Sequence, residues 1–145
     1  MFLRKGFTIL ELLIVIAVIA ILVGIALPRF KGMRDEGNIA KAKGELRSLQ
    51  TAVESINIHT GSYPADITDA TLAAAVPMIL KTAPLDPFGG AAYGYLRAAP
   101  YYVIWSIGPG LNGAASVTSA GVASETAGAA SCIYVTNGSP LDTTP

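Results

Sequence analysis

Apolar and polar residues form three successive patterns along the chain. From Phe7 to Pro28 almost every residue is apolar, and the single charged side chain is Glu11. From Asn38 to Ile58 apolar residues recur every three or four positions, which is the period of a helix with one buried face. This stripe consists of Ile39, Ala42, Leu46, Leu49, Val53 and Ile56. Downstream, short aromatic and β-branched runs alternate with loops, which is typical of strands.

The first pattern is long enough to cross a membrane. Its twenty-two residues would rise about 33 Å as a helix, against a hydrocarbon core about 30 Å thick. A cleaved secretory signal peptide has an apolar core of roughly 7–15 residues, so the longer run and its charge disfavour that interpretation. Charge does not orient the span, because Arg4 and Lys5 precede it while Arg29, Lys31 and Arg34 follow it. The sequence predicts one membrane-spanning helix.

Two residues of this predicted span are unusual for their position. A charge at the centre of such a helix costs roughly 2.5–3.5 kcal/mol on insertion. Either Glu11 lies close enough to the end of the span to reach the interface, or a second subunit supplies its partner. Pro28 removes a helical hydrogen bond, so it either ends the span or kinks a longer helix near Gly24.

The second pattern predicts an amphipathic helix that needs a surface to lie on. Asn38, after Gly37, is a plausible N-cap if the helix is broken after Pro28. His59 in the last turn, with Gly61 just beyond it, indicates a C-terminus. A stripe of this kind is far more often part of a hydrophobic core than a binding site.

That surface is predicted to be a small sheet. The run "YGYLRAAPYYVIWSI" at residues 93–107 predicts two strands joined by a short turn at Pro100, and "CIYVT" at residues 132–136 predicts a third. Residues 113–131 are mostly Gly, Ala, Ser, Thr and Val, and they predict a surface loop. The fold class is therefore α+β: a long N-terminal helix, membrane-spanning in its first half and amphipathic in its second, packed on a small antiparallel sheet.

The connection between helix and sheet, residues 62–90, is rich in proline and predicts a loop. A short helix is expected near Leu72 to Leu80, with Asp66 and Asp69 as its caps. These carboxylates lie in loop-like sequence with no base or metal ligand beside them, so a capping role is favoured over a catalytic one.

Composition excludes several functions. Lys plus Arg and Asp plus Glu number ten each, so no net charge argues for nucleic acid. The cations between residues 29 and 47 are interleaved with acids and are typical of a solvated helix face. Cys132 is the single cysteine, so no intrachain disulfide can form, and it lies far from His59 in the sequence. No catalytic constellation is present, and we expect no enzyme; a membrane-anchored enzyme or binding module is the alternative from another class.

The N-terminal residues resemble those of a known family. A short basic leader ending in Gly6, then Phe7-Thr8, Glu11, an apolar span and Pro28 resemble the type IV filament proteins, which are pilins and type II secretion pseudopilins. The resemblance implies a pilin-like fold, and a membrane peptidase that cuts between Gly6 and Phe7 and methylates the new N-terminus. It also implies that the Glu11 carboxylate pairs with the α-ammonium of Phe7 on a neighbouring subunit, which would set the register of the helices in a filament.

The resemblance also implies a domain organisation, a location and partners. Residues 1–6 would be the cleaved leader, 7–28 the transmembrane and filament-core helix, 29–61 its amphipathic continuation, and 62–145 the globular loop-plus-sheet region. The chain would cross the bacterial inner membrane once with its globular part periplasmic, and would be periplasmic or extracellular once in a filament. The expected partners are further copies in a helical filament, the prepilin peptidase, an inner-membrane assembly platform, minor pilins or pseudopilins, and membrane lipid before assembly; nucleic acid is not required.

The C-terminal half resembles one branch of this family. The segments "TGSYP", "APLDPFGGAAYGY" and "YVIWSIGPGLNG" are similar to the major pseudopilin of type II secretion, with Phe88 in place of the usual Trp. That pseudopilin binds calcium through acidic residues after its Gly-Pro turn, whereas residues 111–113 are Leu-Asn-Gly here, and no Asp or Glu occurs between Asp86 and Glu125. We therefore expect no metal-binding residues and no cofactor, with calcium disfavoured.

The alternative within the family is a major type IVa pilin used for adhesion, motility or DNA uptake. Major pilins usually carry a C-terminal disulfide loop, which one cysteine cannot form, although some short pilins lack that loop. The predicted exposed loop at 113–131 suits a pilus exterior better than a compact secretion subunit. A minor subunit at a filament tip is disfavoured because Glu11 is present.

Overall fold

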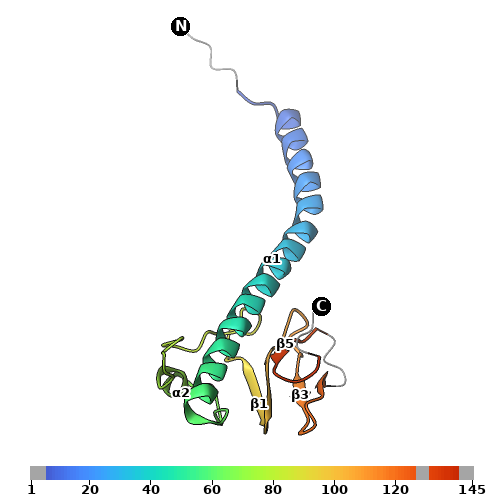
Figure 1. The fold of residues 1–145 in the computed structure, drawn as a ribbon. Coiled ribbons are helices and arrows are strands. Elements are labelled where there is room, and N and C mark those ends of the chain that lie inside the picture. The colour runs from blue at the N-terminus through green and yellow to red at the C-terminus, as the bar shows by residue number, and fades with distance from the viewer. Residues whose placement is uncertain (1–5, 127–130, 141–145) are drawn as a thin grey trace. The chain divides into compact units, whose positions relative to one another are not determined.

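The computed structural model describes residues 6–126 and 131–140 of the chain. The described residues divide into two compact units, one ending at Glu36 and the other beginning at Gly37. The elements follow the predicted order, a long helix and then strands, so the α+β fold class is confirmed (Figure 1).

Helix α1 (Ile9–Thr60) contains 52 residues without interruption, and both units contain part of it. Pro28 lies inside α1, so it does not end the helix, and Asn38 is an interior residue and not an N-cap. The condition for that N-cap, a break after Pro28, is therefore not met, and of the two alternatives for Pro28 the longer helix is the one observed. A proline removes a single backbone hydrogen bond, and the good helix formers on both sides continue the helix past it. The predicted end is confirmed, because Gly61 has a φ of 74° and its N–H donates to the carbonyl of Asn57 at 2.8 Å.

In the second unit, the expected stripe of α1 lies on an antiparallel sheet. Strands β1 (Gly94–Ala98), β2 (Tyr101–Ser106) and β5 (Ile133–Thr136) are arranged in the order β1-β2-β5. All three predicted strands are thus confirmed, including the short turn at Pro100 between β1 and β2. The stripe on α1 is buried as predicted, apart from Ile39, which is half-buried.

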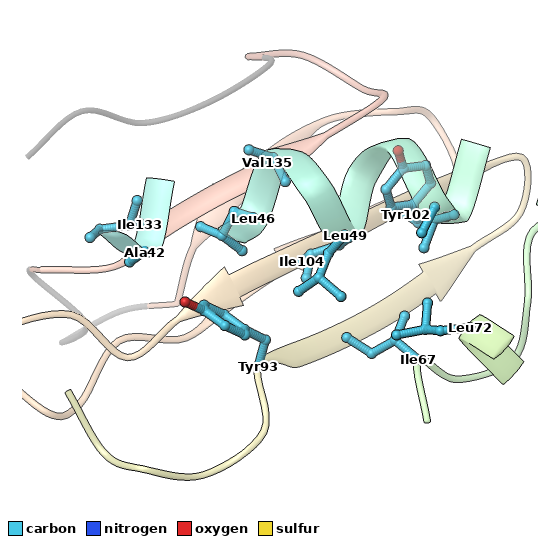
Figure 2. Close-up of a cluster of buried hydrophobic side chains, with 12 residues drawn as sticks. Ala42, Leu46, Leu49, Ile67, Leu72, Tyr93, Tyr102, Ile104, Ile133 and Val135 are labelled. Carbon is cyan, nitrogen blue, oxygen red and sulfur yellow. The ribbon is translucent and has the colours of Figure 1, made fainter. Parts of the chain in front are cut away.

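The central strand β2 is covered on both faces because its side chains alternate. Tyr102 and Ile104 point toward the stripe of α1 and join the main core with Leu46 and Leu49 (Figure 2). Val103, between them, belongs to a second cluster on the opposite face of the sheet.

A second sheet covers that opposite face. Strands β3 (Ala115–Val117) and β4 (Ala123–Glu125) form an antiparallel hairpin whose buried side chains are all small. The expectation that residues 113–131 are entirely loop is therefore wrong. Small residues are needed because the hairpin lies close to β2. A Cβ at Gly121, whose φ is 82°, would lie 2.6 Å from the ring of Tyr101 in β2.

The connecting region contains a shorter helix than expected. Helix α2 (Asp69–Ala73) replaces the predicted helix near Leu72 to Leu80. Its N-cap is Thr68, not an aspartate, because the Thr68 hydroxyl accepts the backbone N–H of Thr71. Asp66 supports the cap from outside, since its Oδ1 accepts hydrogen bonds from the backbone and the hydroxyl of Thr68. Three prolines at positions 77, 84 and 87 favour the loop that follows.

Candidate assembly site on the N-terminal helix

The start of α1 is fixed by a threonine that the sequence reasoning overlooked. Thr8 precedes the first helical residue, and its Oγ1 accepts the backbone N–H of Glu11 at 3.2 Å. The carbonyl of Thr8 accepts the N–H of Leu12, also at 3.2 Å. Threonine followed three residues later by glutamate is the capping-box pattern, so this signal was visible in the sequence. Thr8 therefore caps the helix, which begins at Ile9, two residues after Phe7.

The predicted processing and assembly residues lie at this end of α1. Gly6, Phe7 and Glu11 are all exposed to solvent. Glu11 is in the first helical turn, where the helix dipole favours a negative charge. Its carboxylate has no ion pair with the described part of the chain. Pro28 does not lie with these residues, because it comes seventeen positions after Glu11 along the helix, a rise of about 26 Å.

The first unit exposes apolar side chains on every side of α1. The large hydrophobic residues from Phe7 to Met33 are between 47% and 85% exposed. Single exposed hydrophobic residues are ordinary, but a continuous apolar surface marks an interaction with lipid or protein. By length and composition, this helix could span a membrane. The predicted membrane-spanning segment is thus confirmed by its length and its composition.

In the second unit, glutamates of α1 contact tyrosines on or beside the sheet at two points. Glu54 accepts hydrogen bonds from Tyr102 at 2.7 Å and from Tyr63 at 3.1 Å, one at each carboxylate oxygen. Nine residues earlier on the helix, Glu45 accepts the Tyr93 hydroxyl at 2.6 Å. Bonds to an ionised acceptor are stronger than neutral ones. They fix the position of α1 along the sheet, which apolar packing alone specifies less sharply.

These contacts change the acidity of the tyrosines. Burial, followed by the hydrogen bond to Glu54, raises the pKa of Tyr102. The pKa of Tyr93 is raised by burial and then by Glu45. Burial raises the pKa of Tyr95 to about 12. All three therefore stay neutral and able to donate at any physiological pH.

The buried carboxylate of Asp86 has a structural role. Asp86 is 2% exposed, and its two oxygens accept the backbone N–H groups of Phe88 at 3.0 Å and Ile107 at 2.8 Å. It thus ties the turn before β1 to the end of β2. In the next turn, where the family resemblance would place a calcium site, the N–H of Gly113 donates to the carbonyl of Ile107. Within residues 6–126 and 131–140, no three Asp, Glu, His or Cys side chains come together as metal ligands.

Comparison with known proteins identifies a family motif at the N-terminal end of the chain. Residues 1–27 match the model of the prokaryotic N-terminal methylation motif. The resemblance to type IV filament proteins, first seen in Gly6, Phe7 and Glu11, is therefore confirmed.

Particular relatives fall into two groups. The chain is similar to the fimbrial protein EcpB of Eikenella corrodens, with 49% identity over 46% of this chain and 42% of that protein. It is also similar to type II secretion system core protein G of Pectobacterium carotovorum, with 29% identity over 67% of this chain and 60% of that protein. The Escherichia coli K12 core protein G is 29% identical over 81% of each chain. The chain covers less than two thirds of the length of EcpB and of the Pectobacterium carotovorum core protein G. No solved structure matches the chain.

Proposed function

We propose that this chain is a structural subunit of a type IV-like filament, and specifically the major pseudopilin of a type II secretion system. The observation that carries the proposal is the exposed apolar surface of α1 from Phe7 to Met33, joined to a methylation motif and to a carboxylate at Glu11. Lipid covers this surface before assembly, and neighbouring copies cover it in the filament. The proposed role is structural, with no catalytic step and no bound cofactor.

The extent of the similarity favours the pseudopilin branch. Similarity to the core proteins G reaches 64–81% of this chain, so it extends past α1 into the sheet. Similarity to the fimbrial proteins and to the type IV major pilin PilE of Neisseria gonorrhoeae covers 36–50%. The N-terminal helix is common to both branches, and the sheet region distinguishes them. A pilus subunit is the second candidate, supported by the 49% identity to EcpB over 66 residues.

Processing would create the partner that Glu11 requires. In the uncut chain the nitrogen of Phe7 is part of a peptide bond with Gly6 and carries no charge. Cleavage between them gives Phe7 an α-ammonium group, one residue before the Thr8 cap. Two opposite charges about 4 Å apart attract by about 4 kcal/mol at an effective dielectric constant of 20. A pair of this strength between neighbouring copies favours one axial register, because other registers leave both charges unpaired in an apolar bundle.

The remaining partners and the location follow from the same proposal. The second unit lies on the periplasmic side of the inner membrane, an orientation supported by the family resemblance and not by the charges that flank the span. A prepilin peptidase removes the leader, and an assembly platform with minor pilins or pseudopilins starts the filament.

Glu11→Ala tests the proposal, with Glu11→Asp as the matched variant that keeps the charge. We expect Glu11→Ala to insert and to be cleaved normally, because Thr8 caps the helix through a backbone N–H. Filament recovery should fall sharply in Glu11→Ala and less in Glu11→Asp. Normal filaments from Glu11→Ala would refute the pairing.

N-terminal mass analysis of membrane and sheared surface fractions separates the two branches. N-methyl-phenylalanine at Phe7 in membranes alone supports the pseudopilin. The same terminus in sheared wild-type filaments supports the pilus subunit. An intact Met1 in both fractions would overturn the proposal altogether.

A further inference from the structure

A groove opens on the second unit between the segment before α2 and strand β1. Its volume is about 570 Å³, and its apolar walls include Ile67, Leu85, Ala92, Tyr93 and Tyr95. Leu85 is 58% exposed, although it lies beside the buried core. Water at an apolar recess with an exposed leucine is unfavourable. Covering the recess with another apolar group lowers the free energy, because apolar surface is removed from water.

Two carboxylates line the same groove, and each has one oxygen engaged within the unit. Oδ1 of Asp66 accepts the hydroxyls of Thr68 at 3.0 Å and Thr71 at 2.6 Å, and Oδ1 of Asp69 accepts the N–H of Ala83 at 2.6 Å. These bonds orient the side chains, and those to Asp66 lower the pKa of its carboxyl. Neither aspartate forms an ion pair with a Lys or Arg of the described segments. The groove therefore presents two oriented negative charges beside an apolar wall.

Helix α1 carries a complementary patch just after the apolar run. Phe30 is 64% and Met33 67% exposed, and the exposed Arg29 and Arg34 adjoin them. Spacings of three and four residues place these four side chains on one face. Neither arginine has a carboxylate partner within the part of the chain that the structure describes. The patch thus combines two cations, which complement the two carboxylates of the groove, with two apolar side chains, which match its apolar wall.

We propose that the groove of one copy receives residues 29–34 of α1 from a second copy, with Arg29 and Arg34 facing Asp66 and Asp69, and Phe30 covering Leu85. This inference rests on the proposed filament. Before assembly the two arginines lie immediately beyond the apolar run, where lipid phosphates pair with them. When α1 leaves the bilayer, these cations lose the phosphates, and the carboxylates of a neighbouring copy replace them. The contact thereby couples helix packing to docking of the second unit.

Charge reversal tests the electrostatic part. We expect D66K/D69K and R29E/R34E each to lower the yield of filaments about tenfold, and the four substitutions together in one chain to restore most of it. E125K and R47E are matched controls, because both residues are exposed and lie outside the groove and the patch. D66N/D69N keeps Oδ1 as an acceptor for the loop, so a loss of yield there reports the charge and not the fold. Yields equal to those of the controls, or no recovery in the combined variant, would overturn the inference.

Cysteine cross-linking tests the apolar part and identifies the occupant. Copies carrying F30C and copies carrying L85C, with different tags, are expressed together and oxidised in filaments. We expect a mixed dimer that is absent when V122C replaces L85C, since Val122 and Leu85 are 55% and 58% exposed. Native Cys132 does not interfere, because it is fully buried and burial raises its pKa to about 12.

The outcomes separate this inference from the proposed function. Absence of filaments from the wild-type chain would overturn both. Normal wild-type filaments with no mixed dimer would overturn the groove contact and leave the filament proposal intact. If R29E/R34E releases the chain from membranes while D66K/D69K assembles normally, the arginines serve lipid alone and the groove contact is wrong.

Discussion

Replacing Glu54 by alanine should loosen the attachment of α1 to the sheet by an amount that the structure allows us to work out. The substitution removes the acceptor of two tyrosine hydroxyls, those of Tyr102 and Tyr63. A hydrogen bond to a charged group contributes about 1.5–3 kcal/mol, and a buried donor left alone costs a similar amount. Tyr102 is fully buried and bears that cost, whereas Tyr63 is half-buried and water can replace its partner. We expect the free energy of unfolding to fall by about 2–4 kcal/mol.

The assay is thermal unfolding of the full chain in detergent, followed by the fluorescence of Trp105. For a unit of about 100 residues, 1 kcal/mol corresponds to about 4 °C, so the midpoint should fall by about 8–16 °C. Tyr102→Phe should cost about 1–2 kcal/mol, because Glu54 keeps its bond to Tyr63. In the double variant the two effects should overlap and not add. Glu125→Ala, which removes an exposed carboxylate, is the control and should shift the midpoint by no more than about 2 °C. A Glu54→Ala midpoint equal to that of the control would refute the reasoning.

Three further predictions concern processing, packing and pH. Gly6→Ala should slow or block cleavage, and a normal yield of chains beginning at Phe7 would show that the cut site is wrongly assigned. Gly94→Ala should destabilise the second unit by about 1–3 kcal/mol and change the Trp105 emission maximum, because the new Cβ would lie 2.1 Å from the indole ring; an unchanged spectrum and midpoint would contradict this packing. Stability should fall as the pH rises from about 10 to 12, because tyrosines whose pKa is raised, such as Tyr95, ionise first in the unfolded chain. A pH titration of the unfolding midpoint that stays level to pH 12 would count against it.

Sequence patterns predicted the elements whose side chains repeat at a fixed period. The stripe from Ala42 to Ile56 was found because burial on one face of a helix leaves a three-four spacing. β2 and β5 were found because aromatic and β-branched residues dominate them. The hairpin of β3 and β4 was missed because its close packing requires small side chains, and runs of Ala, Ser and Gly look the same in a loop.

The candidate assembly site was predictable only where its residues lie close together in the sequence. Gly6, Phe7 and Glu11 form a local motif, and Thr8 belonged to a capping pattern that could have been recognised. The contacts of Glu45 and Glu54 could not be predicted, because each tyrosine partner on or beside the sheet lies 48 residues away in the sequence. The groove at Asp66 and Asp69 also depends on folding, which brings the α2 segment beside β1.

The paired attachment of α1 has a mechanical consequence. Glu45 and Glu54 lie nine residues apart, which is about 13.5 Å along the helix axis, and they contact Tyr93 before β1 and Tyr102 in β2. A tensile force applied along α1 is therefore borne by both tyrosine contacts at once, in shear. The helix cannot slip by one turn without breaking both and displacing Leu49 from its place in the core. Force on the part of α1 that lies in the second unit is thus delivered to the strands of the same unit.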